Sequence, residues 1–238
     1  MLKIEFTLTI KSQSISNIIM LFKHYWANKN FVSKNIHYYD RLVNKINCQH
    51  VWKCSERYII NHYRSNISHY HLEIGPGSGY FLKKENLLKN PSIDQLTLID
   101  VNSEILDFSK ENLTQDYCND IVTLNFDIFS DKIPSGIKFN SVGLNYVLHC
   151  IPGKLENKLD TLLDNLDHTG YNLFGATVIS DPLHMNPLAE YELMLLNTLG
   201  IFNNNHDSYE DLSQYLIKNN IKHNISKRGY VALFSIEV

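Results

Sequence analysis

The chain of 238 residues is poor in cysteine and proline and has no long hydrophobic run. Its four cysteines, Cys48, Cys54, Cys118 and Cys150, form no C-x-x-C pair and are too few for a disulfide scaffold. We therefore expect reduced thiols, a cytoplasmic location and no metal site. No run approaches the roughly 18 apolar residues that a membrane span requires. We also expect no signal peptide, because polar residues break the apolar run at residues 15–22.

The chain also lacks a large excess of charge of either sign. Lys and Arg number 22 and Asp and Glu number 25, so the formal net charge is −3, and no basic block stands out. Because nucleic-acid-binding proteins carry a concentrated basic patch, we expect no nucleic acid partner. The length and the hydrophobic fraction of 44% suit one globular domain with a full core. Asparagine is plentiful, as at residues 203–205, and we interpret this as compositional bias.

The most informative segment is residues 71–81, with the sequence HLEIGPGSGYF. A β-prone apolar run leads into glycines at every second position, Gly75, Gly77 and Gly79, and the pattern then becomes helical. A strand that turns into a helix through glycines holds a nucleotide-like ligand in an open α/β sheet. Glycine serves there because a side chain would block the ligand and because some φ values are positive.

The spacing of the glycines discriminates between ligands. In the dinucleotide fingerprint G-x-G-x-x-G the third glycine lets the helix approach the strand. Here that position holds Tyr80, which disfavours an NAD-dependent dehydrogenase. Glu73, two residues before the first glycine, would repel a pyrophosphate. A carboxylate at this place suits a ligand with a cationic end, such as an ammonium or a sulfonium.

Two further predicted strands also end in an acid. Residues 95–100 end in Asp100, about 20 residues after the glycines, which is the offset of a ribose-binding carboxylate. One carboxylate can accept hydrogen bonds from two vicinal hydroxyls. The third strand, residues 121–126, is followed by Asp127. We therefore expect Glu73, Asp100 and Asp127 to lie along one rim of the sheet.

These motifs resemble those of the class I S-adenosylmethionine-dependent methyltransferases. The block at residues 143–153, GLNYVLHCIPG, resembles more closely a group of small-molecule methyltransferases of microbial secondary metabolism. The matching segments are residues 71–81, 98–102, 125–128, 139–153, 170–177 and 229–235. Together these segments account for the arrangement of the chain from about residue 38 to its end.

The resemblance implies an α/β fold with a Rossmann-like, seven-stranded, mostly parallel sheet, an antiparallel last strand and an N-terminal helical cap. We expect a single methyltransferase domain, residues 1–238, with the cap at 1–69 and the cofactor-binding core at 70–238. The implied cofactor is S-adenosyl-L-methionine. The residues implied to bind it are Glu73, Gly75, Gly77, Gly79, Asp100, Val101, Asp127, Ile128 and Asn145. Glu73 and Asn145 would lie at the methionyl end and Asp100 at the ribose, with Val101, Asp127 and Ile128 around the adenine.

Local patterns predict the other elements. Residues 1–10 alternate, which predicts an edge strand or an extension, and residues 14–68 have a helical pattern. Asp207, with Glu210 three residues later, is expected to cap a helix. The elements expected after the third strand are a strand at 141–148, a helix at 155–167, a strand at 171–180, helices at 188–199 and 209–218, and a hairpin of 222–226 with 230–238.

The chain offers few candidates for acceptor chemistry. His149, shortly after Asn145, is the best general base, because imidazole titrates near neutrality. The competing interpretation, equally favoured, is that His149 packs or caps the next helix. Cys150 lacks a partner pattern and is interpreted as a core thiol.

Candidates for lining the acceptor pocket are Tyr38, Tyr39, Asp40, Trp52, Tyr146, His184 and Met185, each with ordinary packing or a surface loop as the alternative. Tyr146 is not part of an Asn-Pro-Pro-aromatic motif, which argues against nucleobase and glutamine amines as acceptors.

We therefore predict methyl transfer to a small-molecule acceptor, at oxygen. The alternatives are a protein or RNA methyltransferase and a cofactor-binding module that does not methylate. Every recognised motif concerns the cofactor, so the acceptor and the oligomeric state do not follow from the sequence.

Overall fold

The computed structural model describes residues 40–84, 87–89, 93–115, 117, 121–181 and 184–238. The predicted strand or extension at residues 1–10, Tyr38, Tyr39 and Cys118 lie outside the described residues. In the described part no helix is long and apolar enough to cross a membrane.

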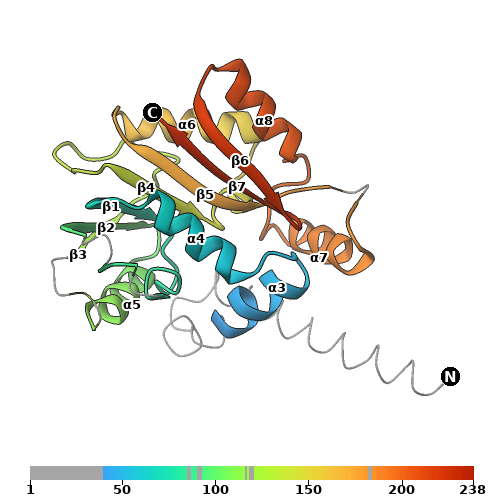
Figure 1. Cartoon of the computed structure of the whole chain (residues 1–238), viewed down its shortest axis with the longest axis horizontal. Helices are drawn as coiled ribbons and strands as arrows, with labels where there is room; N and C mark the ends of the chain where they lie inside the picture. Colours follow the sequence, from blue (N-terminus) through green and yellow to red (C-terminus); the bar gives the residue numbers. More distant parts are fainter. Residues whose placement is uncertain (1–39, 85–86, 90–92, 116, 118–120, 182–183) are drawn as a thin grey trace.

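A seven-stranded mixed sheet forms the centre of the protein (Figure 1). The strand order is β3-β2-β1-β4-β5-β7-β6. The strands are β1 (Tyr70–Ile74), β2 (Gln95–Asp100), β3 (Ile121–Asn125), β4 (Ser141–Asn145), β5 (Asn172–Val178), β6 (Lys222–Arg228) and β7 (Val231–Glu237). Neighbouring strands from β3 to β5 pair in parallel, whereas β7 pairs antiparallel with both β5 and β6. The predicted sheet, including the antiparallel strand, is confirmed.

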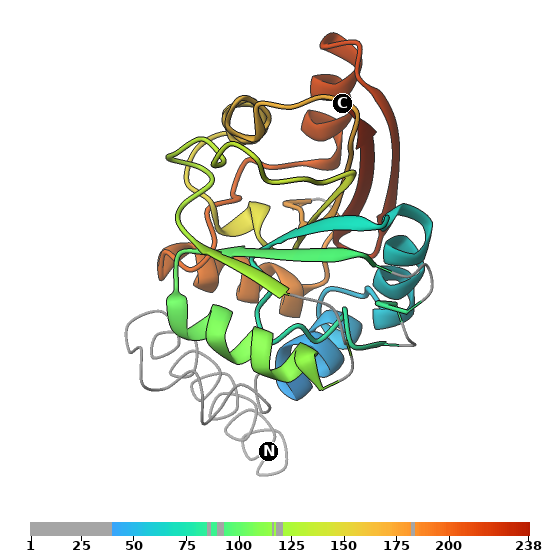
Figure 2. The ribbon, with the colours of Figure 1, turned by 90° about the vertical axis from the view of Figure 1, so that its left-hand side faces the viewer.

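Helices cover both faces of the sheet, as the side view in Figure 2 shows. On one side lie α4 (Glu56–Asn66), α5 (Ser103–Thr114) and α7 (Pro187–Thr198), and on the other α6 (Leu155–Leu166) and α8 (Tyr209–Lys218). The short segments η2 (Asp40–Asn47), α3 (Cys48–His50) and η4 (Leu148–Cys150) complete the described helical structure. All five residues of β4 are buried, as expected for a central parallel strand covered on both faces.

The helix α6 illustrates how sequence periodicity becomes packing. Its leucines at positions 155, 159, 162 and 166 recur at helical spacing and are all buried in the core between the sheet and α8. The helix ends at Asp167, which has a left-handed backbone with φ of 44°. The predicted and observed ends of α6 agree within one residue.

Two predicted elements are wrong in their detail. The fourth strand ends at Asn145 and does not reach residue 148, because Tyr146 adopts a φ of +58° and a 3-10 turn follows. The glycine segment does not lead into a helix, and residues 75–83 form successive turns. Three left-handed glycines there interrupt the repeating i to i−4 hydrogen bonds that a helix needs.

The cap of α8 is also displaced from its predicted position by one residue. Ser208 is the N-cap, and its hydroxyl accepts from the Asp211 N–H while the Asp211 carboxylate accepts from the Ser208 N–H. This reciprocal arrangement is a capping box. Asp207, the predicted cap, is buried and paired with Lys158.

Candidate cofactor and acceptor site

A cavity of about 550 Å³ opens at the carboxyl ends of the central strands. Every predicted cofactor-binding residue lines it, and so do Trp52, Tyr146 and His149. Of the other predicted acceptor residues, His184 is exposed and paired with Asp181, and Met185 packs against the core outside the cavity lining. Asp40 lies in η2. The fold thus collects residues from five separate segments at one edge of the sheet.

The glycine loop forms the floor of the cavity after β1. Gly75 has a φ of +64°, and a Cβ placed there would lie 2.5 Å from Val147 Cγ2. Gly77 has a φ of +57°, but a Cβ there would meet nothing within 4 Å. Gly75 is therefore needed for packing against the segment after β4. Gly77 leaves its space open on the side where a ligand can lie against the backbone.

Glu73 is buried at the end of β1 and is held on both carboxylate oxygens. Tyr63 donates its hydroxyl hydrogen to Oε1 over 2.7 Å, and Nε2 of His71 lies 2.9 Å from Oε2. Ser141 Oγ accepts from Ser68 and lies 2.9 Å from Nδ1 of His71, so its own hydrogen points to that nitrogen. His71 therefore carries its hydrogen on Nε2 and donates it to Glu73. Each oxygen of Glu73 keeps a second lone pair for a cationic ligand.

Asn145 supports a ligand at the same end of the cavity. Its side chain is 7% exposed, and among the described residues neither its amide nitrogen nor its amide oxygen has a hydrogen-bond partner. Because an unmade hydrogen bond on a buried amide is costly, this side chain calls for a polar group inside the cavity. An amino acid moiety offers both a donor and an acceptor. The residues present therefore fit the methionyl end of the cofactor.

Asp100 lies at the end of β2 beside the open part of the cavity. Its Oδ1 accepts from the backbone N–H of Asn102 over 2.8 Å, which fixes the carboxylate at the start of α5. Burial raises the pKa of Asp100 to about 6. The next residue, Val101, is 57% exposed and presents an apolar surface at the cavity edge.

Asp127 is oriented by its own turn. Its Oδ1 accepts from the backbone N–H of Phe129 over 2.9 Å, and its Oδ2 accepts from the Ser130 hydroxyl over 2.7 Å. Ile128 is buried and also lines the cavity. The three strand-end acids therefore share the predicted rim but differ in their surroundings. Glu73 is buried, Asp100 is partly buried, and Asp127 stabilises a turn.

The far end of the cavity is apolar and includes residues that the sequence analysis missed. Phe202 lies with its ring centre 4.2 Å from that of His149 and 6.0 Å from that of Trp52. The missed lining residues are Val43, Asn47, Cys48, Val178, Leu196, Ile201 and Phe202. No local motif marks them, because they come from loops and helices that only the fold brings to this place. The helical periodicity of α7 is the one signal that could have suggested Leu196.

His149 faces the cavity but is strongly buried, at 3% exposure. Its Nδ1 accepts from the backbone N–H of Val178 over 3.2 Å, so the ring hydrogen lies on Nε2. Burial and, to a lesser degree, the charge of Lys158 lower the pKa of His149 to about 3. A neutral imidazole whose free lone pair is already used is a weak base. The role of His149 as a general base therefore stays a prediction.

The other titratable groups at this end are neutral near pH 7. Burial raises the pKa of Cys48 to about 12, of Cys54 to about 11 and of Cys150 to about 12. Burial also raises the pKa of Tyr146 well above its ordinary value. Within the part of the chain that the structure describes, no three His, Cys, Asp or Glu side chains are placed to hold a metal ion.

Comparison with known proteins identifies relatives of this chain, although no family model matches it. Methyltransferase VerB of Penicillium polonicum is 30% identical over 215 residues, which cover 83% of this chain and 92% of the relative. Demethylluteothin O-methyltransferase of Streptomyces thioluteus is 28% identical over 82% of this chain and 84% of the relative. The N-methyltransferase VrtF of Penicillium aethiopicum is 30% identical over 71% of this chain and 69% of the relative.

Among solved structures, human N-acetylserotonin methyltransferase in complex with SAM superimposes with a TM-score of 0.60 at 17% identity. The alignment covers 91% of this chain but only 58% of the human one, so this chain spans little more than half of that structure. The shared fold, the glycine loop after β1 and the 30% identity over most of both chains agree. The chain therefore belongs to the class I S-adenosylmethionine-dependent methyltransferases.

Proposed function

We propose that this protein transfers the methyl group of S-adenosylmethionine to an oxygen atom of a small, uncharged acceptor. The observation that carries the proposal is the division of a single cavity into two chemically different ends. Strand-end acids, the glycine loop and the unpartnered amide of Asn145 line one end. Apolar and aromatic side chains with neutral titratable groups line the other.

The residues of the polar end would hold the cofactor. Glu73 would accept from the ammonium and Asn145 would bond to the same amino acid end. Asp100 would accept from the ribose hydroxyls, with Val101 and Ile128 against the adenine. Asp127 would accept from the exocyclic amine of the adenine with a lone pair that its turn leaves free. When bound, the cofactor supplies a sulfonium-activated methyl group.

The apolar end would orient the acceptor and exclude water. Trp52, Tyr146 and Phe202 supply flat surfaces, and Tyr39 precedes this region in the chain. Buried neutral walls penalise an acceptor that carries a net charge, because a buried ion without a partner is costly. A hydroxyl compound fits such walls better than an amine, which is largely protonated near neutral pH. The relatives include both O- and N-methyltransferases, so this preference rests on the cavity.

His149 is the proposed proton acceptor at this end, and it would accept the proton at Nδ1 by giving up the hydrogen bond from the Val178 N–H. Its weak basicity limits it to acceptors whose hydroxyl is itself acidic. An acidic hydroxyl delivers its proton easily, so an acceptor of this kind reduces the demand on any base.

Two measurements test the proposal. Isothermal titration with S-adenosylhomocysteine should show one site, and Asp100→Ala should weaken it by about ten-fold or more, since hydrogen bonds to a charged group contribute about 1.5–3 kcal/mol. Incubation with S-adenosylmethionine labelled in its methyl group and a library of hydroxylated and amine compounds should then label hydroxyl compounds. Labelled products that carry the methyl on nitrogen would contradict the choice of oxygen.

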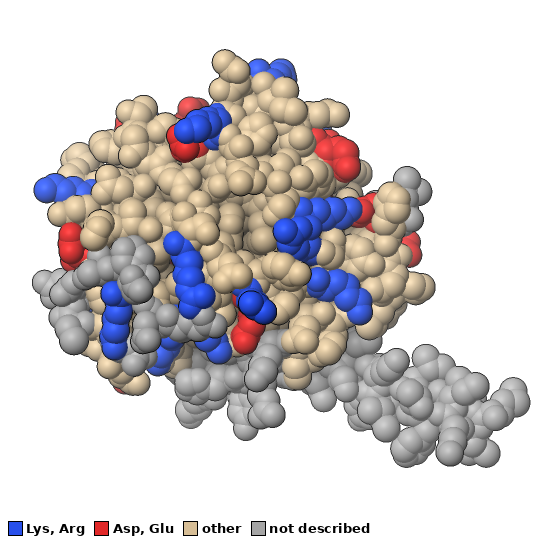
Figure 3. All heavy atoms as spheres, viewed as in Figure 1, with Lys and Arg blue, Asp and Glu red and all other residues tan. Residues whose placement is uncertain are grey.

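A macromolecular acceptor is the second candidate, and one observation favours it. Figure 3 shows more Lys and Arg than Asp and Glu on the face that α4 occupies in Figure 1. Lys53 and Arg57 are exposed beside or on this helix, and the guanidinium of Arg228 lies over the ring of Tyr58. Labelling of protein or RNA in a cell extract that falls steeply with salt would support this candidate. Labelling of small molecules that is insensitive to salt would support the first.

A further inference from the structure

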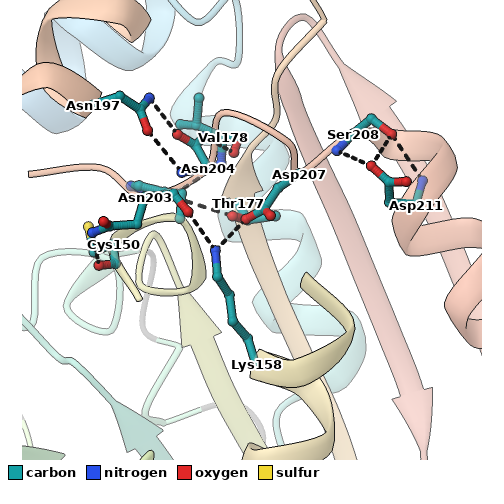
Figure 4. A network of polar contacts seen from close by, with 11 residues as sticks. Cys150, Lys158, Thr177, Val178, Asn197, Asn203, Asn204, Asp207, Ser208 and Asp211 are labelled. Atoms are coloured by element: carbon teal, nitrogen blue, oxygen red, sulfur yellow. Dashed lines mark hydrogen bonds and ion pairs between the residues drawn. The ribbon is translucent and has the colours of Figure 1, made fainter. Parts of the chain in front are cut away.

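A buried ion pair outside the cavity holds the segment that forms the apolar end. Lys158 of α6 is 2% exposed, and its Nζ lies 2.5 Å from Oδ2 of Asp207 and 2.8 Å from the carbonyl oxygen of Asn203 (Figure 4). Asp207 is also 2% exposed. Burying two charges costs much of what their attraction contributes. The contribution of the pair to overall stability is therefore small, which indicates another role for it.

The two residues that Lys158 contacts, Asn203 and Asp207, lie in the loop between α7 and α8. Asn203 donates from its backbone N–H to the carbonyl of His149 over 2.7 Å and from its side chain to the carbonyl of Cys150 over 2.9 Å. Asn204 is fully buried and donates to the carbonyl of Val178 over 2.7 Å. The asparagine run thus ties this loop to η4 and to the end of β5, so Asn203 and Asn204 have structural roles that compositional bias alone does not explain.

The loop carries part of the cavity wall immediately before these bonds. Ile201 and Phe202 line the cavity, and Phe202 contacts the ring of His149. The next residue, Asn203, is bonded by Lys158 through its carbonyl oxygen. A displacement of Lys158 would therefore move the residue that follows Phe202. Neither Lys158 nor Asp207 lines the cavity.

We propose that Lys158 and Asp207 are a positioning pair that fixes Phe202, and with it the shape of the acceptor end, without contributing to cofactor binding. The proposal rests on the function proposed above, in which this end receives the acceptor. The pair joins α6, on one side of the sheet, to a loop that walls the cavity. Packing at the acceptor end would then depend on a residue from the opposite helical layer.

The test uses the fluorescence of Trp52, whose ring lies next to Phe202 and is 2% exposed. The chain contains two tryptophans, so Trp26→Phe leaves Trp52 as the single reporter. In this background we expect Lys158→Met to increase acrylamide quenching of Trp52 at least two-fold, because Phe202 loses its fixed position. The affinity for S-adenosylhomocysteine should stay within two-fold of the parent.

Because Lys158→Met leaves an unpaired buried carboxylate, it can fail to fold. The double variant Lys158→Met with Asp207→Asn removes both charges, nearly keeps the buried volume and leaves no buried charge without its partner. We expect the same increase in quenching from it. The matched control is Lys132→Met, which breaks the exposed pair between Lys132 and Asp167 at 3.0 Å and should change nothing.

A double-mutant cycle separates positioning from general loosening. Phe202→Ala alone should raise quenching, and adding both pair substitutions should raise it no further, since the two changes act on one contact. Additive effects, unchanged quenching in the double variant, or lost affinity for S-adenosylhomocysteine would each overturn the proposal. Failure of the parent protein to bind S-adenosylhomocysteine would instead refute the proposed function.

Discussion

Tyr63, on α4, donates its hydroxyl hydrogen to Glu73, at the end of β1, over 2.7 Å inside the core. The ring of Tyr63 is itself held edge-on against Phe174, with ring centres 5.2 Å apart. A residue from the predicted N-terminal cap thus orients the carboxylate of Glu73 at the proposed cofactor site. The helix before β1 therefore supports this end of the cavity from within the core.

Tyr63→Phe removes this hydrogen bond and keeps the packing of the ring. We expect it to weaken S-adenosylhomocysteine binding by about ten-fold, because a hydrogen bond to a charged group contributes about 1.5–3 kcal/mol. Binding of 5′-methylthioadenosine, which lacks the amino acid end, should not change. Isothermal titration with both ligands makes the comparison, and an equal loss for both would place Glu73 away from the amino acid.

Binding of the cofactor should depend on pH through Asp100. Burial raises its pKa from 3.8 to about 6 in the folded protein, so the carboxylate is ionised above about pH 7 and becomes protonated as the pH falls through 6. The affinity for S-adenosylhomocysteine should therefore be full at pH 7.5 and decline toward pH 5. The matched variant Asp100→Asn should bind weakly and without this decline. Parallel pH profiles for the two proteins would contradict the assignment.

The same shift changes stability in the opposite direction. A carboxyl whose folded pKa is raised binds its proton more tightly in the folded state, so Asp100 should favour folding more as the pH decreases from 7 to 4. Asp100→Asn should remove this contribution. Urea denaturation at several pH values measures it, as the difference in pH dependence between the two proteins.

Two glycine substitutions should separate strain from blockage of the ligand. Gly77→Ala and Gly136→Ala both place a Cβ at positive φ, 57° and 92°, with nothing within 4 Å. Both should lower stability by about 1–2 kcal/mol, the cost of a left-handed non-glycine residue. Only Gly77→Ala should also impair binding of S-adenosylhomocysteine, because Gly77 lines the cavity and Gly136 does not. Equal affinities in the two variants would show that no ligand lies against Gly77.

His149→Ala tests the proton acceptor once an acceptor compound is available. Loss of a general base typically costs about 10²–10⁴ in rate, and we expect a loss in this range with unchanged affinity for S-adenosylhomocysteine. Since the pKa of His149 is lowered to about 3, the parent's rate should show no change attributable to this residue between pH 5 and 8. A fully active His149→Ala enzyme would restrict the residue to packing against Phe202.

Much of the cofactor end could be predicted because its signals are local. Gly75 and Gly77 mark a loop whose positive φ values glycine adopts without strain, and Asp100 ends its apolar strand. The apolar spacing after Gly77 predicts a helix, but this spacing does not report the three left-handed glycines that prevent one. Asp207 matches the pattern of an N-cap, but Ser208, next to it, satisfies the same pattern one residue later and is the cap in the structure.

The sequence by itself determined which strands end in an acidic residue and where the glycine turn lies. Both features depend on residues that are neighbours in the chain. Only the tertiary structure decided what surrounds them. Tyr63 and His71 converge on Glu73, Phe202 meets His149, and Lys158 reaches Asp207 from another layer. The contact of Phe202 with His149 joins residues 53 positions apart, and that of Lys158 with Asp207 joins residues 49 positions apart. Such long-range packing leaves no periodic trace in the chain.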